Sequence, residues 1–346
     1  MHRNGRVLLI YTGGTIGMGL NRETSTLEPL DFNHLIARMP EFAAIPAGID
    51  VHQFNTPIDS SDMSPRLWAR IVEIIVGHYD NYDGFVVLHG TDTMAFTAAA
   101  LSFMLQNLTK PVILTGSQLP INQLRTDGRE NLITSIEIAA AHNSDGFPRV
   151  PEVCIYFNGR LLRGNRAIKF NADGFNAFDS FNFPHLADAG IDIHYHEELI
   201  LQPDYTRPMT PHFAMDSNVF VFTLFPGIQE ELVRHILGTK TLRGVVMRTY
   251  GSGNAPQLPW LMDALSEASD RGVNIVNITQ CTAGSIEMAR YNGGFQLHNA
   301  GVISGYDSTV ECAIAKLMHL QAHYSDYQTI RHMMNTALCG EITTNE

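Results

Sequence analysis

The chain has 346 residues, of which 45% are hydrophobic and 17% charged, and its formal net charge is -12. This length suggests two domains, and the composition is that of a globular protein able to build sizeable cores. The acidic balance argues against nucleic acid as a partner, because phosphate binding needs a basic surface, and it argues weakly against an anionic membrane surface. No apolar run approaches the roughly 18 residues that a membrane span requires.

The N-terminal residues and the cysteines bear on the cellular compartment. Residues 1–5 are polar and an apolar run follows at once, so the sequence contains no recognisable secretory signal. The four cysteines, Cys154, Cys281, Cys312 and Cys339, are far apart and form no CxxC pair. We therefore expect a reduced, cytoplasmic protein with free thiols.

In the first half of the chain, short apolar runs alternate with helical patterns. The runs at 7–11, 85–88, 112–115 and 153–157 predict buried strands. Helices are expected after Ser64, with Pro65 in the first turn, and over about 93–108 and 127–142. Strands separated by helices predict right-handed crossovers and a mostly parallel sheet that is covered on both faces.

Residues 159–184 interrupt this alternation. The segment is rich in Asn, Phe, Gly and Asp, shows no clear periodicity, and contains five phenylalanines. A long irregular segment inside a compact domain is usually functional or disordered, and its aromatic content favours order.

The second half resumes the alternation after prolines at 203, 208 and 211. Strands are predicted at 219–225, 245–248 and 273–278, and helices at 230–237, 258–269, 309–324 and 327–338. The pattern predicts an α/β protein with a larger N-terminal domain (1–196), whose mostly parallel sheet is flanked by helices. A linker (197–216) and a smaller C-terminal α/β domain (217–346) follow.

Three loops follow predicted strand ends, where open α/β sheets bind ligands. They are Tyr11–Gly17, His89–Thr93 and Thr115–Gln118. The glycines of the first loop could cradle a phosphate, but their spacing fits neither GxGxxG nor GK[ST]. Taken alone, the first loop is therefore as consistent with a simple tight turn as with a ligand-binding loop.

The second loop places Thr91 beside Asp92 just past a buried strand. Asp92 could simply cap the next helix, and a threonine at a strand end is often only a strand former. A threonine nucleophile, however, needs a base, and a lysine in a suitable environment can serve. Lys169 is the candidate, with a solvated surface lysine as the alternative.

Two serines and two pairs of histidines have other possible roles. Ser60 and Ser61 follow another strand-like stretch, where capping and turn bonding are the simple alternatives to ligand binding. The pairs His194-x-His196 and His319-x3-His323 have metal-like spacing, but no cysteine or acidic residue at ligand spacing completes either pair. We expect surface roles for these histidines and no metal site.

Six ordered segments resemble the asparaginase/glutaminase family. They are Tyr11–Gly17, Asp59–Met63, His89–Thr93, Arg163–Arg166 followed by Lys169, Tyr250–Pro256 and Thr279–Cys281. The resemblance covers essentially the whole chain and is greatest to the cytoplasmic, type I bacterial enzymes. It implies an L-asparaginase that hydrolyses L-asparagine to L-aspartate and ammonia through an acyl-enzyme.

The resemblance also implies roles for individual residues. Thr15, directly after the two glycines, matches the nucleophile, whereas Thr12 belongs to the strand end. Thr91, Asp92 and Lys169 match a second catalytic group, in which Asp92 also holds the substrate's α-ammonium. Ser60 and Ser61, with the Asp59 backbone, match the residues that hold the α-carboxylate. The family needs no cofactor or metal and implies a homodimer or a homotetramer.

The sequence departs from the family pattern at two positions. Many relatives carry a lid tyrosine after the first threonine, but residues 23–29 contain none, and Ile168 stands where some type I enzymes have threonine. Some type I enzymes also bind a second asparagine as an effector. Residues resembling that site are Arg248, Asn254, Thr279 and Cys281, for which simple packing is the alternative.

Competing interpretations share parts of the same pattern. A glutaminase-preferring enzyme of the same fold would differ by pocket contacts worth about 1–3 kcal/mol. A subunit that supplies ammonia to a transamidation complex would need its partner for activity. A non-catalytic amino-acid-binding protein would also have two α/β domains, but it would have no use for two threonines and a lysine at one site. The glycine spacing disfavours a dinucleotide-binding dehydrogenase.

Overall fold

The computed structural model describes residues 5–20, 27–29, 32, 40–288 and 292–344. The chain forms two compact units, 1–213 and 214–346, and the boundary falls inside the predicted linker. The exact limits 1–196, 197–216 and 217–346 stay a prediction. In the described part of the chain, no helix is long and apolar enough to cross a membrane.

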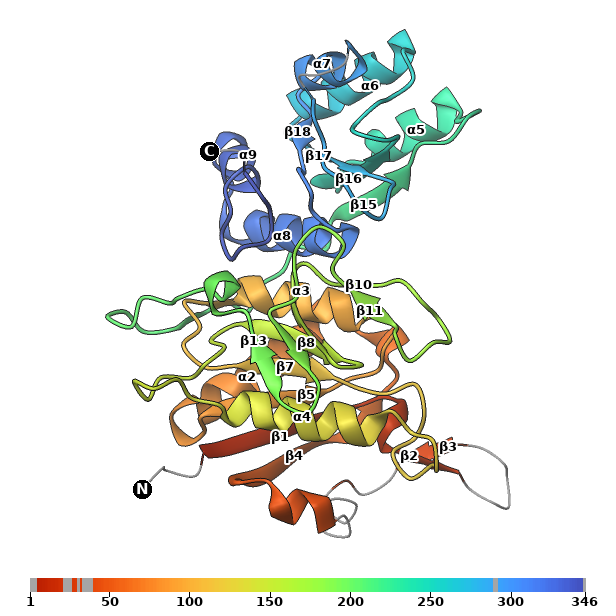
Figure 1. Cartoon of the computed structure of the whole chain (residues 1–346). Helices are drawn as coiled ribbons and strands as arrows, with labels where there is room; N and C mark the ends of the chain where they lie inside the picture. The colour runs from red at the N-terminus through yellow and green to blue at the C-terminus, as the bar shows by residue number, and fades with distance from the viewer. Residues whose placement is uncertain (1–4, 21–26, 30–31, 33–39, 289–291, 345–346) are drawn as a thin grey trace. The chain divides into compact units, whose positions relative to one another are not determined.

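Unit 1 is built on an eight-stranded sheet with the order β13-β12-β9-β8-β7-β5-β1-β4 (Figure 1). The five strands from β4 to β8 run parallel, and β9, β12 and β13 are antiparallel additions at the far edge. The strands are β1 (Gly5–Gly13), β4 (Ala47–Ile58), β5 (Gly84–Leu88), β7 (Val112–Thr115), β8 (Val153–Phe157), β9 (Arg160–Arg163), β12 (Ala187–Ala189) and β13 (Ile193–Tyr195).

In the described part of unit 1, three α-helices cover this sheet. They are α2 (Pro65–His78), α3 (Met94–Met104) and α4 (Gly128–Ala140). Pro65 occupies the first turn of α2, where its missing N–H costs nothing, and Trp68, Ile71 and Ile75 form the buried face. Helix α3 is apolar on every side and is buried almost throughout, which explains why its sequence shows no amphipathic pattern.

The helices of unit 1 lie on both faces of the sheet (Figure 1). Leu132 and Ile136 of α4 pack with Val7 and Val86 in one core, whereas Phe85, which points to the opposite face, stacks on Tyr79 at the end of α2. Helix α3 contacts α2 on that opposite face. Both faces of the sheet are therefore buried, as predicted.

The two crossovers that follow β5 have opposite hands. The connections β5-α3-β7 and β7-α4-β8 step in the same direction across the sheet, yet their helices cover opposite faces. One of them is therefore left-handed, and the prediction of right-handed crossovers throughout is wrong. The physical reason lies in burial: α2 and α3 lie on one face, and of the α-helices that the structure describes in unit 1, α4 is the one that packs on the second apolar core.

The segment 159–184 is more regular than its sequence suggests. It contains β9 and a small antiparallel pair, β10 (Ile168–Lys169) with β11 (Phe178–Asp179). Strands of two residues are too short to leave a period in the sequence. Two further short pairs are β2 (Met18–Leu20) with β3 (Leu27–Pro29) and β6 (Leu105–Gln106) with β14 (Thr210–Pro211).

Single-turn helices in unit 1 are η1 (Thr15–Gly17), η2 (Pro40–Ala44), η3 (Ser60–Asp62), η4 (Tyr79–Asn81) and η5 (Glu197–Leu199). Two of them, η1 and η3, directly follow strands β1 and β4. They place the residues after these strands close to the carboxyl edge of the sheet.

Unit 2 is a smaller α/β unit with a parallel sheet in the order β15-β16-β17-β18. Helices α5, α6 and α7 cover one face, and α8 and α9 cover the other. The elements are β15 (Val219–Thr223), α5 (Glu230–Leu237), β16 (Gly244–Thr249), α6 (Pro259–Asp270), β17 (Asn274–Thr279), α7 (Asn292–Asn299), β18 (Ile303–Ser304), α8 (Val310–His323) and α9 (Tyr327–Met334). The predicted fold class is confirmed. The prediction of a surface role is wrong for His319, because this side chain is buried in α8.

Candidate active site

The candidate site lies at the carboxyl ends of four adjacent parallel strands, β4, β1, β5 and β7. From β1 the chain moves to β4 at the edge of the sheet, whereas from β5 it moves the other way, through α3 to β7. The crevice between β1 and β5 is therefore the point where the connections diverge. Open α/β sheets bind ligands at such a point, because it leaves room between two loops.

The two loops that border this crevice touch through their glycines. Gly14 has φ +89°, and a Cβ atom there would come within 2.6 Å of the Gly90 nitrogen. Gly13 has φ +143°, and its Cβ would overlap the carbonyl oxygen of Ile58 on β4. Both positions require glycine for backbone conformation and for close approach. The first loop is therefore more than a turn, since it packs its backbone against the loop that carries Thr91.

The structure separates the two threonines of the first loop. Thr12 is 1% exposed and donates its hydroxyl hydrogen bond to the Leu88 carbonyl, so it is part of the β1–β5 core. Thr15 begins η1 and is partly exposed. Only Thr15 is therefore accessible to a ligand, as the sequence analysis expects.

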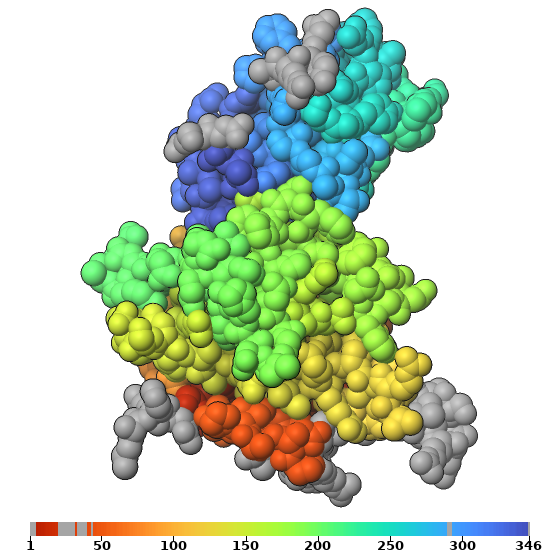
Figure 2. All heavy atoms as spheres, viewed as in Figure 1, coloured from red at the N-terminus to blue at the C-terminus, as the bar shows by residue number. Residues whose placement is uncertain are grey.

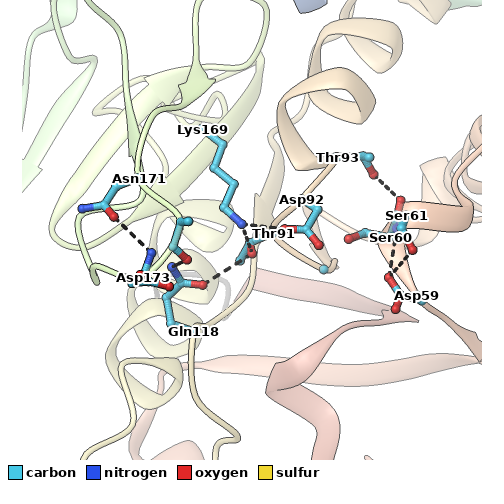
Figure 3. Close-up of polar contacts among 12 residues, drawn as sticks. Asp59, Ser60, Ser61, Thr91, Asp92, Thr93, Gln118, Lys169, Asn171 and Asp173 are labelled. Carbon is cyan, nitrogen blue, oxygen red and sulfur yellow. Dashed lines mark hydrogen bonds and ion pairs between the residues drawn. The ribbon is translucent and has the colours of Figure 1, made fainter.

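Lys169 reaches from β10 to the second loop (Figure 3). Its ammonium group donates to Thr91 Oγ1 at 2.9 Å and forms an ion pair with Asp92 Oδ1 at 2.6 Å. The Lys169 side chain is 17% exposed and that of Asp92 is 65% exposed. The alternative of a solvated surface lysine is wrong for Lys169. Asp92 is also not the helix cap, because the N-cap residue of α3 is Thr93.

Gln118, from the loop after β7, connects Thr91 to the segment beyond Lys169. Its side-chain amide donates to the carbonyls of Ala172 and Gly174, both at 3.0 Å, and its oxygen lies 3.5 Å from Thr91 Oγ1. Asp127 accepts hydrogen bonds from the Gln118 backbone N–H and holds this loop at the start of α4. The sequence analysis located the loop but did not single out Gln118; its position after a third strand end was the available signal.

The residues after β4 form a polar shelf on the other side of Thr91 (Figure 3). Asp59 Oδ1 accepts from the backbone N–H and from the hydroxyl of Ser61, both at 2.9 Å. These hydrogen bonds, the backbone one first, lower the pKa of the exposed Asp59 carboxyl. Ser60 is buried, its carbonyl accepts from the Thr93 hydroxyl at 2.6 Å, and its Oγ lies beside Gly90.

A buried hydrogen-bond chain supports the second loop from below. The Trp68 indole N–H donates to Thr97 Oγ1, the Thr97 hydroxyl bonds His89 Nε2, and His89 Nδ1 lies 2.6 Å from the Gly90 carbonyl. Because an indole only donates and a carbonyl only accepts, the His89 proton must be on Nδ1. Burial lowers the pKa of His89 to about 4, so the ring is neutral near pH 7.

The four residues of the suggested effector site lie in unit 2: Arg248 is in β16 and Thr279 ends β17, whereas Asn254 and Cys281 lie in the loops that follow these strands. Thr279 Oγ1 donates to the Gly251 carbonyl at 2.6 Å and accepts from the Cys281 N–H. Asn254 closes the neighbouring turn through its backbone contact with Tyr250. Arg248 reaches the Gln280 carbonyl at 3.5 Å. The fold thus gathers all four residues at one sheet edge.

The expected site residues thus fall into two groups. The structure joins Thr91, Asp92 and Lys169 by direct contacts, and it places Thr15 and the Asp59–Ser61 segment on the neighbouring loops. Residues 23–29 contain no tyrosine at the place of the family's lid, and of these residues 23–26 lie outside the described part of the chain.

Comparison with known proteins agrees with this geometry. The family profiles "Asparaginase, N-terminal" and "Glutaminase/Asparaginase C-terminal domain" match residues 6–201 and 218–334. The chain belongs to the asparaginase family. It is 44% identical to L-asparaginase 1 of Escherichia coli K12, over 98% of each chain.

Two further relatives show how widely this family architecture is used. The chain is 41% identical to the human 60 kDa lysophospholipase, over 98% of this chain and 61% of the human protein. The crystal structure of L-asparaginase I from Vibrio cholerae matches with a TM-score of 0.90 and 42% identity, over 99% of this chain and 100% of that one. Both domains of the fold are therefore shared with asparaginases along their whole length.

Proposed function

We propose that the chain is an L-asparaginase that hydrolyses L-asparagine to L-aspartate and ammonia. Its family membership supports amide hydrolysis as the reaction class. One observation carries the proposal for this chain's own residues: Lys169 contacts both Thr91 and Asp92, beside the loop that presents Thr15. This arrangement combines a hydroxyl, a proton-transferring amine and a carboxylate at one crevice.

The first step of the proposed reaction is attack by Thr15. Its Oγ forms a bond to the side-chain carbonyl carbon of asparagine, and the negative oxygen is stabilised by backbone N–H groups of the glycine-rich loops. The C–N bond then breaks, and the nitrogen leaves as ammonia after it takes up the proton that the Thr15 hydroxyl gave up. The product is an ester between Thr15 and the aspartyl group.

The second step is hydrolysis of this acyl-enzyme. Water adds to the ester carbonyl, and the Thr91–Lys169 pair relays its proton: Thr91 accepts a proton from the water as one is passed on to the Thr15 oxygen, which leaves as a hydroxyl. The 2.9 Å contact between Thr91 Oγ1 and Lys169 Nζ provides the path for this proton. The aspartate and the free hydroxyl of Thr15 are regenerated without any cofactor.

The polar groups around the crevice match the two charges of the substrate. Asp92 uses Oδ1 for Lys169, and none of the described residues donates a hydrogen bond to its other carboxylate oxygen. That oxygen can accept the α-ammonium in a charge-assisted bond. On the opposite side, the Ser60 hydroxyl and the Asp59 backbone provide hydrogen bonds for the α-carboxylate. The Ser61 hydroxyl, which here donates to Asp59 Oδ1, can add a third when it turns to the substrate.

The decisive experiment measures ammonia release from L-asparagine and L-glutamine by the native protein, Thr15→Val and Thr91→Val. We expect fast release from asparagine and its loss in both variants. Faster release from glutamine would favour the glutaminase alternative. If the folded native protein released ammonia from neither amide, the enzyme proposal would fail and a non-catalytic amino-acid-binding protein would replace it.

A second asparagine site in unit 2 is supported by the environment of Arg248. Its Nε is buried, and among the described residues none accepts a hydrogen bond from it. A buried guanidinium N–H without an acceptor suits the carboxylate of an amino acid. We therefore include in the proposal an effector site lined by Arg248, Asn254, Thr279 and Cys281. The test is the dependence of rate on asparagine: a sigmoidal curve that becomes hyperbolic in Arg248→Ala supports it, and a hyperbolic native curve overturns it.

The proposal extends to assembly and location. Similarity to E. coli L-asparaginase 1, together with four free cysteines, supports a cytoplasmic homo-oligomer. Light scattering of the purified protein distinguishes a monomer from the expected dimer or tetramer. Fractionation of the source cells tests the location.

A further inference from the structure

The catalytic lysine of the proposed mechanism lies on a strand pair outside the main sheet. Lys169 on β10 pairs with Phe178 on β11, and Ile168 pairs with Asp179. No backbone ladder joins this pair to the eight-stranded sheet in the described part of the chain. The position of Lys169 therefore depends on the buried segment 163–167 before it, whose Gly164 N–H donates to the Val153 carbonyl, and on side chains that connect β11 to its neighbours.

Two neighbouring residues of β11 make these connections. Phe178 packs on Phe157 of β8, with ring centroids 5.1 Å apart. Asp179 forms an ion pair with Arg160 Nη1 at 2.6 Å, at the start of β9, and a second contact with His185 Nε2 at 3.0 Å. The contact between Phe178 and Phe157 does not depend on pH, whereas the ion pair of Asp179 with His185 exists only when the imidazole is protonated.

His185 connects β11 to the edge of the main sheet. Its Nε2 faces Asp179, and its Nδ1 lies 3.1 Å from Asp188 Oδ1 on β12. An ionised carboxylate only accepts hydrogen bonds, so both contacts can be hydrogen bonds only when both ring nitrogens carry a proton. A neutral His185 keeps one of the two and leaves the other as a contact between lone pairs.

Other charged groups around His185 favour this arrangement. Asp188 is the cross-strand partner of Arg160, and its second oxygen lies 3.1 Å from His196 Nε2, just after β13. His194 of β13 stands edge-on to the His196 ring. Burial is the largest single effect and tends to raise the pKa of both Asp179 and Asp188. The hydrogen bonds and charges of their histidine partners, joined at Asp179 by the Ser180 N–H and the Arg160 charge, together outweigh it, so the net pKa of each carboxyl is lowered.

We propose that His185 is a positioning residue that, as an imidazolium, clamps β11 to β12 and so holds Lys169 against Thr91 and Asp92. Loss of the His185 proton releases one side of the clamp and loosens the strand pair. The inference rests on the proposed function for its effect on catalysis, but the clamp itself does not require it. Solvent can reach the clamp, because the side chains of His185 and Asp188 are 24% and 51% exposed. The stretch of about 150–205 (yellow-green to green) forms much of the visible surface of unit 1 in Figure 2.

The substitution Asp188→Asn tests the clamp without touching the site. An asparagine amide can donate to Nδ1 of a neutral His185, whose Nε2–H still donates to Asp179, so the variant keeps both links at any pH. Asparagine turnover is measured for both proteins from about pH 5.5 to about pH 8.5, the range in which histidines generally titrate. We expect native kcat to fall about five- to tenfold relative to the variant as pH rises, as for one partly exposed charge-assisted bond.

A second readout does not depend on activity. Hydrogen exchange of peptides covering 168–179, corrected for the intrinsic effect of pH, should rise with pH in the native protein and stay flat in Asp188→Asn. His185→Arg keeps two hydrogen-bond donors at every pH, so its hydrogen exchange should also stay independent of pH. His142→Gln, at an exposed histidine in the same unit, should retain the native profile. The clamp is overturned if native protein and Asp188→Asn show parallel pH profiles of kcat and equal hydrogen exchange over 168–179. If no protein turns over asparagine, the proposed function alone is overturned.

Discussion

The substitution Lys169→Met separates catalysis from stability at the candidate site. Methionine keeps most of the length of the side chain but removes the amine that contacts Thr91 and Asp92. Loss of a positioned proton-transfer group lowers kcat by about a hundred- to ten-thousandfold. The ion pair itself contributes less than about 1 kcal/mol to folding, because the Asp92 side chain is 65% exposed and water screens the pair.

A second lysine offers a matched control. Lys110 donates to the carbonyls of Tyr79 and Tyr82 and lies over the Tyr79 ring, and none of these contacts is with a residue of the site. Lys110→Met should cost about 1–3 kcal/mol of unfolding free energy, because two partly buried carbonyls lose a charged donor. It should leave kcat unchanged.

The assays are ammonia release at saturating asparagine and urea unfolding followed by circular dichroism. Lys169→Met should lose turnover with an unchanged urea midpoint, and Lys110→Met should do the reverse. If Lys169→Met retained more than about a tenth of native kcat, the proton-transfer role would be refuted. If it lost turnover together with several kcal/mol of stability, the loss would reflect unfolding and the reasoning from exposure would be wrong.

Three further predictions follow from the geometry. Gly14→Ala should lower the free energy of unfolding by at least about 2 kcal/mol and remove most of the activity, because φ at this position is +89° and the new Cβ atom would meet Gly90. Gly77→Ala, in open space on α2, should leave the free energy of unfolding unchanged or raise it by about 0.5–1 kcal/mol. Urea unfolding and asparagine turnover check both variants. Lys316→Met should lower the free energy of unfolding by about 3–5 kcal/mol, because it leaves the fully buried Glu341 carboxylate without its cation. Thermal unfolding measures this loss, and the double variant with Glu341→Gln should recover much of it. The free energy of unfolding should fall as pH drops from 6.5 towards 4, because the unfolded chain binds a proton at His89 (ordinary pKa 6.5) before the folded protein does (pKa about 4). His89 accounts for about 3 kcal/mol of this fall at most. If the free energy of unfolding of His89→Gln depended on pH as steeply as that of the native protein, this prediction would be contradicted.

Family resemblance apart, the predictions that succeeded depend on residues close together in the chain. The apolar run 7–11 is a buried strand, the Ser64-Pro65 start of α2 is correct, and α5 spans the predicted residues Glu230–Leu237. In each of these elements the backbone hydrogen bonds or the burial pattern repeat within a few residues. Strand β4 (Ala47–Ile58) was predicted only as a strand-like stretch before Ser60, without bounds, because as an edge strand it is only partly buried and contains polar residues throughout.

The site divides in the same way. Its loops could be located because glycine, threonine and aspartate follow apolar runs, and the family resemblance added the roles of Thr15 and Lys169. The contact between Lys169 and Thr91 spans 78 residues, and no local pattern encodes it.

The sequence by itself thus determined the strand and helix runs, the strand-end loops and the residue types available for chemistry, since these depend on neighbours along the chain. Only the tertiary structure decided which loops meet, which face α4 covers, and that β11 with His185 supports Lys169. These features depend on side chains brought together from distant segments, where burial and charge pairing act across space and leave no period in the sequence.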